Sequence, residues 1–162
     1  MEIEGLRGAR MGKAQTVLGP VDAAALGTTI THEHLLVTMQ HVSKEPTDPS
    51  RRAAFDAPVT LETLGGLRYG RQPNKDNFGL ADERTAIEES SLYKQAGGCT
   101  LVDATSIGIG RNPAALARIA RATGLNIIMG SSYYVEENYP PGCHVDTKTE
   151  DEIVDEIGRD IF

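Results

Sequence analysis

The sequence predicts an α/β fold built from parallel βαβ units. Two observations carry this prediction: continuously apolar segments at 99–105 and 125–132, and helix-type patterns that alternate with them at 82–96, 111–124 and 149–162. Strands that are apolar throughout are typical of parallel sheets covered by helices. A chain of 162 residues is long enough for one domain with a sizeable core.

The first part of the chain predicts a hairpin-like arm and then a strand. Residues 1–12 carry little pattern and are expected to form a disordered tail, and Met11 is an alternative start of the patterned chain. A short strand is predicted at 14–18, and "GPVD" at 19–22 is predicted to be a turn, because Pro20 fixes φ after a glycine. Residues 27–36, rich in Thr and Ile, are predicted to form the first strand of the sheet.

Residues 37–80 are the least regular part of the sequence. Prolines interrupt regular structure at several positions in this segment, and glycines weaken any helix within it. We therefore expect a long excursion from the sheet, with one helix near 61–69.

The helices of the second half have marked ends. A pair of glycines stops the first of them after residue 96. Asn112 and Pro113 begin the second, and Gly124 ends it. In the third, Thr149 and Glu152 have the spacing of a capping box, and three isoleucines share one helical face: Ile153, Ile157 and Ile161. The chain thus contains about three βα units after the arm.

Composition excludes several classes of partner. There are 23 acidic and 16 basic residues, a net charge of -7, which argues against nucleic acid and anionic membrane surfaces. No apolar run is long enough to span a membrane, and the N-terminus has no apolar core of a secretory signal. The two cysteines, Cys99 and Cys143, are too few for a disulfide framework, so we expect reduced thiols and a cytoplasmic protein.

The stretch "TITHEHLL" contains two of the four histidines in the chain. Because side chains alternate along a strand, His32 and His34 share one face and Glu33 points to the other. The pair lies near the carboxyl end of the predicted strand, where ligands bind in parallel α/β folds. Two imidazoles there can converge on one metal ion. The alternative is that both are core histidines satisfied by hydrogen bonds. His41 and His144 lack such a setting and are predicted to be loop residues.

A longer match resolves part of this ambiguity. "TVLGP" and "GPVDAAALGTTITHEHLL" resemble the opening of the phosphotriesterase family, within the amidohydrolase superfamily. "AGGCTLVDATSIGIGRNPAALARIARATGLNIIMGSSYY" resembles that family's second and third βα units. The resemblance runs from about Lys13 to the end of the chain, so we expect residues 13–162 to form an incomplete metal-dependent hydrolase domain.

The resemblance implies a (β/α)8 TIM barrel with a binuclear metal centre at its carboxyl-terminal mouth. The residues that match its first-strand ligands are His32 and His34. Family members carry Zn²⁺ or a similar divalent metal, and a hydroxide that bridges the two ions attacks a lactone, a carboxylic ester or a phosphotriester. The implied partner is a small-molecule ester or lactone, with a homo-oligomer as a possible assembly.

Other residues receive roles from their places in this pattern. Asp103 and Thr105 close the second strand, where they are expected to bond to neighbouring loops. Arg111 is expected to anchor a loop. Tyr133 and Tyr134 follow the third strand, where the family places aromatics that line the substrate pocket; rim packing is the alternative.

The sequence departs from the family in length. A (β/α)8 barrel takes about 250 residues. The remaining family ligands, from the fourth, fifth, sixth and eighth strands, have no matching positions here, and Glu136, Glu137 and His144 are not substitutes for them. We therefore assign no catalytic residue within the chain and expect these 162 residues alone to be inactive.

Three hypotheses for function follow. The first is a phosphotriesterase-like hydrolase represented by its N-terminal portion, with lactones or carboxylic esters favoured over phosphotriesters. The second is a non-catalytic fragment that acts as a metal-binding or self-associating piece. A nuclease or deaminase of another amidohydrolase branch is disfavoured by the acidic charge and the "GPVD…THEHLL" context.

Overall fold

A parallel sheet organises the computed structural model, which describes residues 12–39, 41, 43–70 and 73–161. The sheet has three strands in the order β3 (Thr29–Glu33), β6 (Thr100–Asp103) and β7 (Asn126–Met129). Both pairings are parallel, which confirms the predicted α/β class. The predicted tail lies outside the described residues, except for Gly12.

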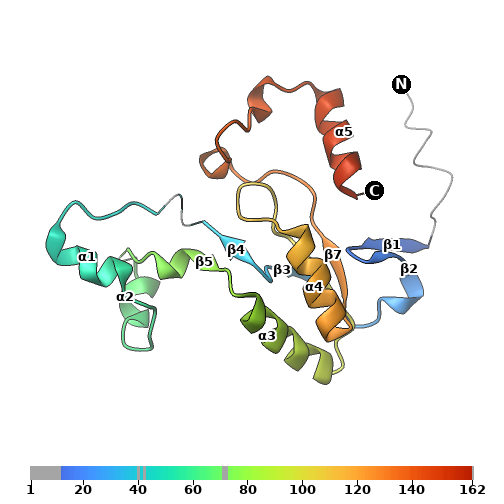
Figure 1. Ribbon diagram of the computed structural model, residues 1–162, viewed down its shortest axis with the longest axis horizontal. Helices are drawn as coiled ribbons and strands as arrows, with labels where there is room; N and C mark the ends of the chain where they lie inside the picture. Colours follow the sequence, from blue (N-terminus) through green and yellow to red (C-terminus); the bar gives the residue numbers. More distant parts are fainter. Residues whose placement is uncertain (1–11, 40, 42, 71–72, 162) are drawn as a thin grey trace.

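Two helices cover one face of this sheet. Figure 1 shows α3 (Glu83–Gln95) and α4 (Pro113–Thr123) side by side along the strands. Their apolar sides form the core with the central residues of β6 and β7, and its largest almost fully buried side chains are Leu101, Leu116, Ile119 and Ile127. The predicted helix ends are confirmed: the side chains of Asp82 and Asn112 cap α3 and α4, and Gly124 ends α4 in the left-handed conformation.

The N-terminal arm is a hairpin, but its turn is not where the sequence predicted it. Strands β1 (Lys13–Thr16) and β2 (Gly19–Asp22) pair antiparallel. "GPVD" is therefore the second strand, and the turn is made by the two residues before it. Pro20 is tolerated in β2 because a two-stranded hairpin leaves one side of each strand without partners. The Val17 N–H donates to the Ile127 carbonyl and ties the arm to β7.

The excursion after β3 is closed at its base by a second small sheet. Strands β4 (Val37–Thr38) and β5 (Gly79–Leu80) pair antiparallel. Beyond them lies the predicted helix, shortened to α2 (Leu64–Arg68), and also α1 (Pro49–Asp56), which was not predicted. Short 3-10 turns complete the described elements: η2 (Ala23–Ala25), η4 (Asp76–Phe78), η5 (Glu136–Asn138) and η6 (Val145–Thr147).

The last helix, α5 (Glu150–Ile161), does not complete a third βα unit with β7. It carries the predicted capping box, with Glu152 accepting from the Thr149 N–H. However, none of its residues is buried, and it lies apart from α3 and α4 (Figure 1). After β7 the chain first continues beside the segment that follows β6, where Ile107 and Tyr133 form a parallel bridge. The helix comes after this stretch and contacts Arg111 and Ser131 through Asp160 instead of covering β7. No helix in the described part of the chain is long and apolar enough to cross a membrane.

Candidate metal centre

The carboxyl end of β3 contains a β-bulge. Ile30 pairs with Leu101 and Glu33 with Asp103, so three steps along β3 match two along β6. A bulge bends the strand and changes the directions of the side chains that follow it. The bulge lies directly at the first of the two predicted metal ligands.

His32 and His34 converge, as the sequence predicted. Their Nε2 atoms are 3.3 Å apart, and the two rings meet edge to face with centroids 5.2 Å apart. Residues two apart on a regular strand are about 7 Å apart along it, so the two rings tilt toward each other. His32 is exposed and His34 is half-buried.

The geometry of this pair fits a zinc-type ion. Zinc binds histidine nitrogen at about 2.0–2.1 Å in tetrahedral geometry, which places two such nitrogens about 3.3 Å apart. The Nε2–Nε2 distance between His32 and His34 has this value. No cluster of three or more His, Cys, Asp or Glu side chains suited to a metal occurs among the described residues. The pair therefore supplies two ligands and not a full set.

The main chain around His34 is fixed by β6. On one side, the Ala104 N–H donates to the Glu33 carbonyl at 2.8 Å. On the other, the Leu35 N–H donates to Asp103 Oδ2 at 2.8 Å. Asp103 is fully buried, and its other oxygen accepts the Thr105 N–H. The predicted role of Asp103, bonding to a neighbouring loop, is confirmed.

Thr105 contacts His34 directly, which the sequence alone did not indicate. Its Oγ lies 3.0 Å from His34 Nδ1 and 3.1 Å from the Leu36 carbonyl oxygen. The bond to Leu36 is the predicted contact with a neighbouring loop. The bond to the imidazole depends on the register between β3 and β6, and the only signal in the sequence is a hydroxyl residue just after a buried strand.

The two predicted pocket tyrosines differ in their surroundings. Tyr134 is 46% exposed. Tyr133 is half-buried, packs edge to face against Tyr139 and accepts a hydrogen bond from Lys148 Nζ at 2.7 Å. Burial raises the pKa of the Tyr133 hydroxyl, and its hydrogen bond to Glu156 acts in the same direction. Among the described residues, no hydrogen bond or ring contact joins Tyr133 or Tyr134 to His32 or His34.

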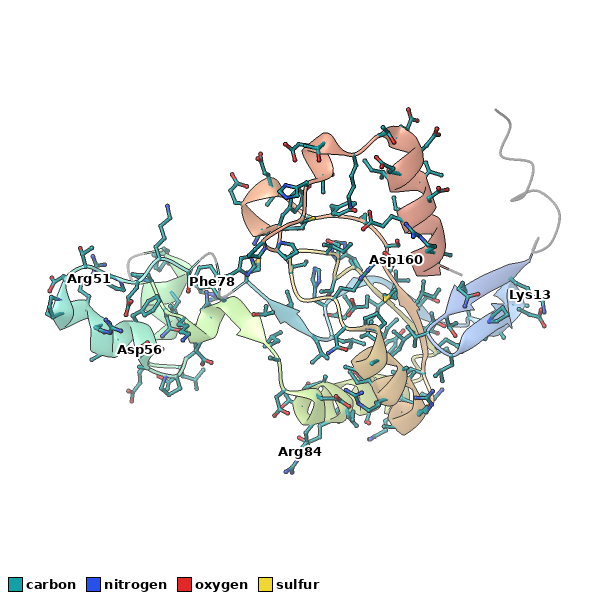
Figure 2. The ribbon with its side chains drawn as sticks, turned by 45° about the horizontal axis from the view of Figure 1, so that its top comes forward. Lys13, Arg51, Asp56, Phe78, Arg84 and Asp160 are labelled. Atoms are coloured by element: carbon teal, nitrogen blue, oxygen red, sulfur yellow. The ribbon has the colours of Figure 1, made fainter. Side chains whose placement is uncertain are left out.

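The predicted anchor, Arg111, is confirmed as one. Its guanidinium pairs with Asp160, which also accepts from Ser131 Oγ. Figure 2 shows Asp160 on α5 facing the body of the molecule. The ion pair joins the start of α4 to the end of α5. His144, Glu136 and Glu137 lie in the segment before α5, where the sequence predicted a loop.

Comparison with known proteins adds family membership to this geometry. Residues 12–162 match the phosphotriesterase family. The chain belongs to the phosphotriesterase family. The predicted resemblance is thereby confirmed over nearly all of the chain.

Named relatives of this phosphotriesterase-family chain are longer than it is. It is 39% identical over 130 residues to N-acetyltaurine hydrolase of Xenopus tropicalis, which covers 79% of the chain and 37% of the relative. It is 37% identical over 149 residues to N-acetyltaurine hydrolase of Danio rerio, covering 90% of the chain and 42% of the relative. The chain thus spans about two fifths of the length of these relatives.

Solved structures of longer proteins superpose on this chain. A resiniferatoxin-binding protein from Rhodobacter sphaeroides superposes with a TM-score of 0.81 at 37% identity, over 91% of this chain and 40% of that one. An organophosphorus hydrolase from Deinococcus radiodurans superposes with a TM-score of 0.51 at 28% identity, over 81% and 31%.

Proposed function

We propose that this chain is the N-terminal part of a metal-dependent hydrolase that acts on small-molecule esters or lactones. The observation that carries the proposal is the 3.3 Å approach of two imidazole nitrogens at the carboxyl end of a parallel strand. Membership of the phosphotriesterase family over 12–162 supports the same reading. In this proposal β3, β6 and β7 are the first strands of a (β/α)8 barrel, and the histidines face its interior.

The proposed cofactor is a divalent metal, Zn²⁺ in the first instance, with two ions in the complete site. His32 and His34 would hold one ion through Nε2. When bound, such ions polarise the scissile bond and make water a nucleophile near neutral pH. Catalytic zinc takes at least three protein ligands, so the other ligands must come from outside the described residues.

The proposal of an ester or lactone substrate rests on the two tyrosines that follow β7. Tyr134, 46% exposed after β7, would line the substrate pocket. The ring of Tyr133 would lie behind it, with its hydroxyl hydrogen-bonded to Lys148. A second candidate reaction is amide hydrolysis, because relatives at 37–39% identity are named for N-acetyltaurine. We place the protein in the cytoplasm, where its two free cysteines would stay reduced.

Metal binding by the chain itself provides the first test. We expect the purified protein to bind Co²⁺, followed by visible absorption, and His32→Ala or His34→Ala to weaken binding by on the order of tenfold or more, because each removes one of two ligands. His144→Ala is the matched control, since this loop histidine should leave Co²⁺ affinity unchanged. Equal Co²⁺ affinity in all four proteins would contradict the proposed centre.

Activity is tested after joining residues 1–162 to the remaining segment of the Rhodobacter sphaeroides relative. We expect metal-dependent hydrolysis in a panel of lactones, carboxylic esters, phosphotriesters and N-acetyl amides, and its loss in His32→Ala. A folded, metal-loaded chimera without turnover on any of them would favour the alternative, a metal-binding or self-associating piece.

A further inference from the structure

The hydroxyl of Thr105 has one proton and two polar neighbours. Thr105 is 1% exposed, and its Oγ has two polar neighbours, the Leu36 carbonyl and His34 Nδ1. A carbonyl oxygen only accepts hydrogen bonds, whereas a hydroxyl has one proton to give. The contact with the Leu36 carbonyl, at 3.1 Å, is a hydrogen bond only when the hydroxyl donates its proton there. In that arrangement the hydroxyl presents a lone pair toward His34, so the bond between Oγ and Nδ1 requires a proton on Nδ1.

This requirement determines the state of the other nitrogen. A neutral imidazole carries one proton, so a proton on Nδ1 leaves a lone pair on Nε2. Free histidine side chains prefer the opposite tautomer, with the proton on Nε2. The contact with Thr105 thus works against the intrinsic preference of the ring. The lone pair is left on the nitrogen that lies 3.3 Å from His32 Nε2.

Asp103 holds Thr105 in place. Its carboxylate, fully buried, accepts the Thr105 N–H at 2.9 Å through Oδ1 and the Leu35 N–H at 2.8 Å through Oδ2. One side chain therefore fixes the main chain of Thr105 and the main chain next to His34. The distance between Oγ and Nδ1 is set by this double contact.

We propose that Thr105 is a positioning residue that fixes His34 as the Nδ1–H tautomer, so that His34 Nε2 carries the lone pair a metal ion needs and accepts from His32 Nε2 while no metal is bound. The metal part of this inference rests on the function proposed above, whereas the tautomer part concerns the metal-free protein. A ligand that is already in the binding tautomer binds without a proton shift within the ring, and partners of this kind typically contribute about tenfold to a hundredfold in metal affinity.

The first measurement needs no variant. Long-range ¹H–¹⁵N NMR of the metal-free protein, at a pH above the ordinary histidine range, separates protonated from unprotonated ring nitrogens. We expect a protonated Nδ1 and an unprotonated Nε2 for His34. A protonated Nε2 would overturn the inference even if the protein binds metal.

The second measurement compares three variants that change buried hydroxyls. Thr105→Val removes the hydroxyl at nearly constant volume, and Thr105→Ser keeps it. Thr100→Val is the matched control: Thr100 is similarly buried, but it lies at the start of β6, and its hydroxyl donates to the Leu26 carbonyl. Any loss of stability from a missing buried hydroxyl is shared by the two valine variants.

We expect Thr105→Val to shift His34 toward the Nε2–H tautomer and to weaken Co²⁺ binding by about tenfold or more. Thr105→Ser and Thr100→Val should keep the wild-type tautomer and affinity. Wild-type nitrogen shifts in Thr105→Val would overturn the inference, and so would an equal loss of affinity in both valine variants. The proposed function is tested separately by Co²⁺ binding to the single variant His34→Ala, because that measurement does not depend on the tautomer of the ring.

Discussion

Gly108 lies where two loops of the molecule meet. It has a φ of +103° in the loop between β6 and α4, and a Cβ added there would stand 2.7 Å from the carbonyl oxygen of Asn138. Neither the backbone angle nor the space suits a larger residue. This single position therefore sets how closely the loop after Thr105 approaches the segment before α5.

Replacing this glycine should be costly. We expect Gly108→Ala to lower the free energy of unfolding by about 1–3 kcal/mol, from the strained φ and the displaced Asn138 backbone. Urea unfolding followed by circular dichroism measures it. Gly65→Ala is the control, because nothing lies within 4 Å of its added Cβ; a helical Gly→Ala change should be neutral or slightly stabilising. Equal urea midpoints for Gly108→Ala and Gly65→Ala would mean that the loop around Gly108 accommodates a methyl group without cost.

Residue-scale predictions from sequence succeeded where they depended on neighbours in the chain. Alternation along a strand predicted that His32 and His34 share a face, and their Nε2 atoms lie 3.3 Å apart even though the bulge interrupts the alternation and His34 follows the end of β3. The bulge between Ile30 and Glu33 was not predictable, because it is defined only by the pairing with β6. For the same reason the contact of Thr105 with His34 was missed: no local pattern specifies the register of two distant strands.

At the scale of elements, capping signals gave the most reliable predictions. Asn112, Gly124 and the Thr149–Glu152 pair mark helix ends in the structure as they do in the sequence. The same logic applied to Asp48 and Pro49 would have found α1, whose N-cap is the Asp48 side chain. The surrounding prolines hid it, because they favour an irregular segment. The position of α5 depends on side-chain pairs with distant loops, and these leave no periodic pattern.

Glu156 gives α5 a pH-dependent attachment. Its hydrogen bond with Lys148 lowers the pKa of the Glu156 carboxyl, and Lys148 also holds the Tyr133 hydroxyl. A carboxyl whose pKa is lower in the folded than in the unfolded chain stabilises the fold above its unfolded pKa. This stabilisation is lost as the pH falls through the folded value.

We therefore expect the wild-type protein to lose more stability than Glu156→Gln as the pH drops from about 5 to 3, through and below the ordinary glutamate range. Urea midpoints at closely spaced pH values measure the difference. Asp155→Asn removes an exposed acid of the same helix and should keep the wild-type slope. Parallel pH curves for wild type and Glu156→Gln would show that this contact does not hold α5.

The whole molecule depends on a core that lies on one face of the sheet. Ile119 of α4 and Ile127 of β7 are fully buried there. On the opposite face Thr31 is exposed, and Val102 and Ile128 are only half-buried. The order of elements in the sequence predicted the layers correctly. It did not predict that, among the helices of the described residues, α3 and α4 alone would cover the sheet, because that outcome depends on how the segment after β7 folds back.

Because the core lies on one face of the sheet, we expect the free energy of unfolding of this chain to be small. We expect Ile119→Ala to lower the free energy of unfolding by about 2–5 kcal/mol, a large part of what a domain typically has. Calorimetry or urea unfolding measures the change. Leu61→Ala, at a position 90% exposed in the excursion, should change it by less than about 0.5 kcal/mol. If Ile119→Ala changed the free energy of unfolding no more than Leu61→Ala does, the main core would have to lie elsewhere.

The contact between His34 and Thr105 joins residues 71 positions apart. During synthesis the histidine therefore emerges well before the residue that orients it, and its ring stays free to exchange tautomers until β6 has been made and has docked beside β3. Contacts that distant form late, because the intervening chain must first be ordered. Metal capture by this pair would then report the moment at which the first two parallel strands lock together, and a metal offered earlier would meet a flexible pair of histidines.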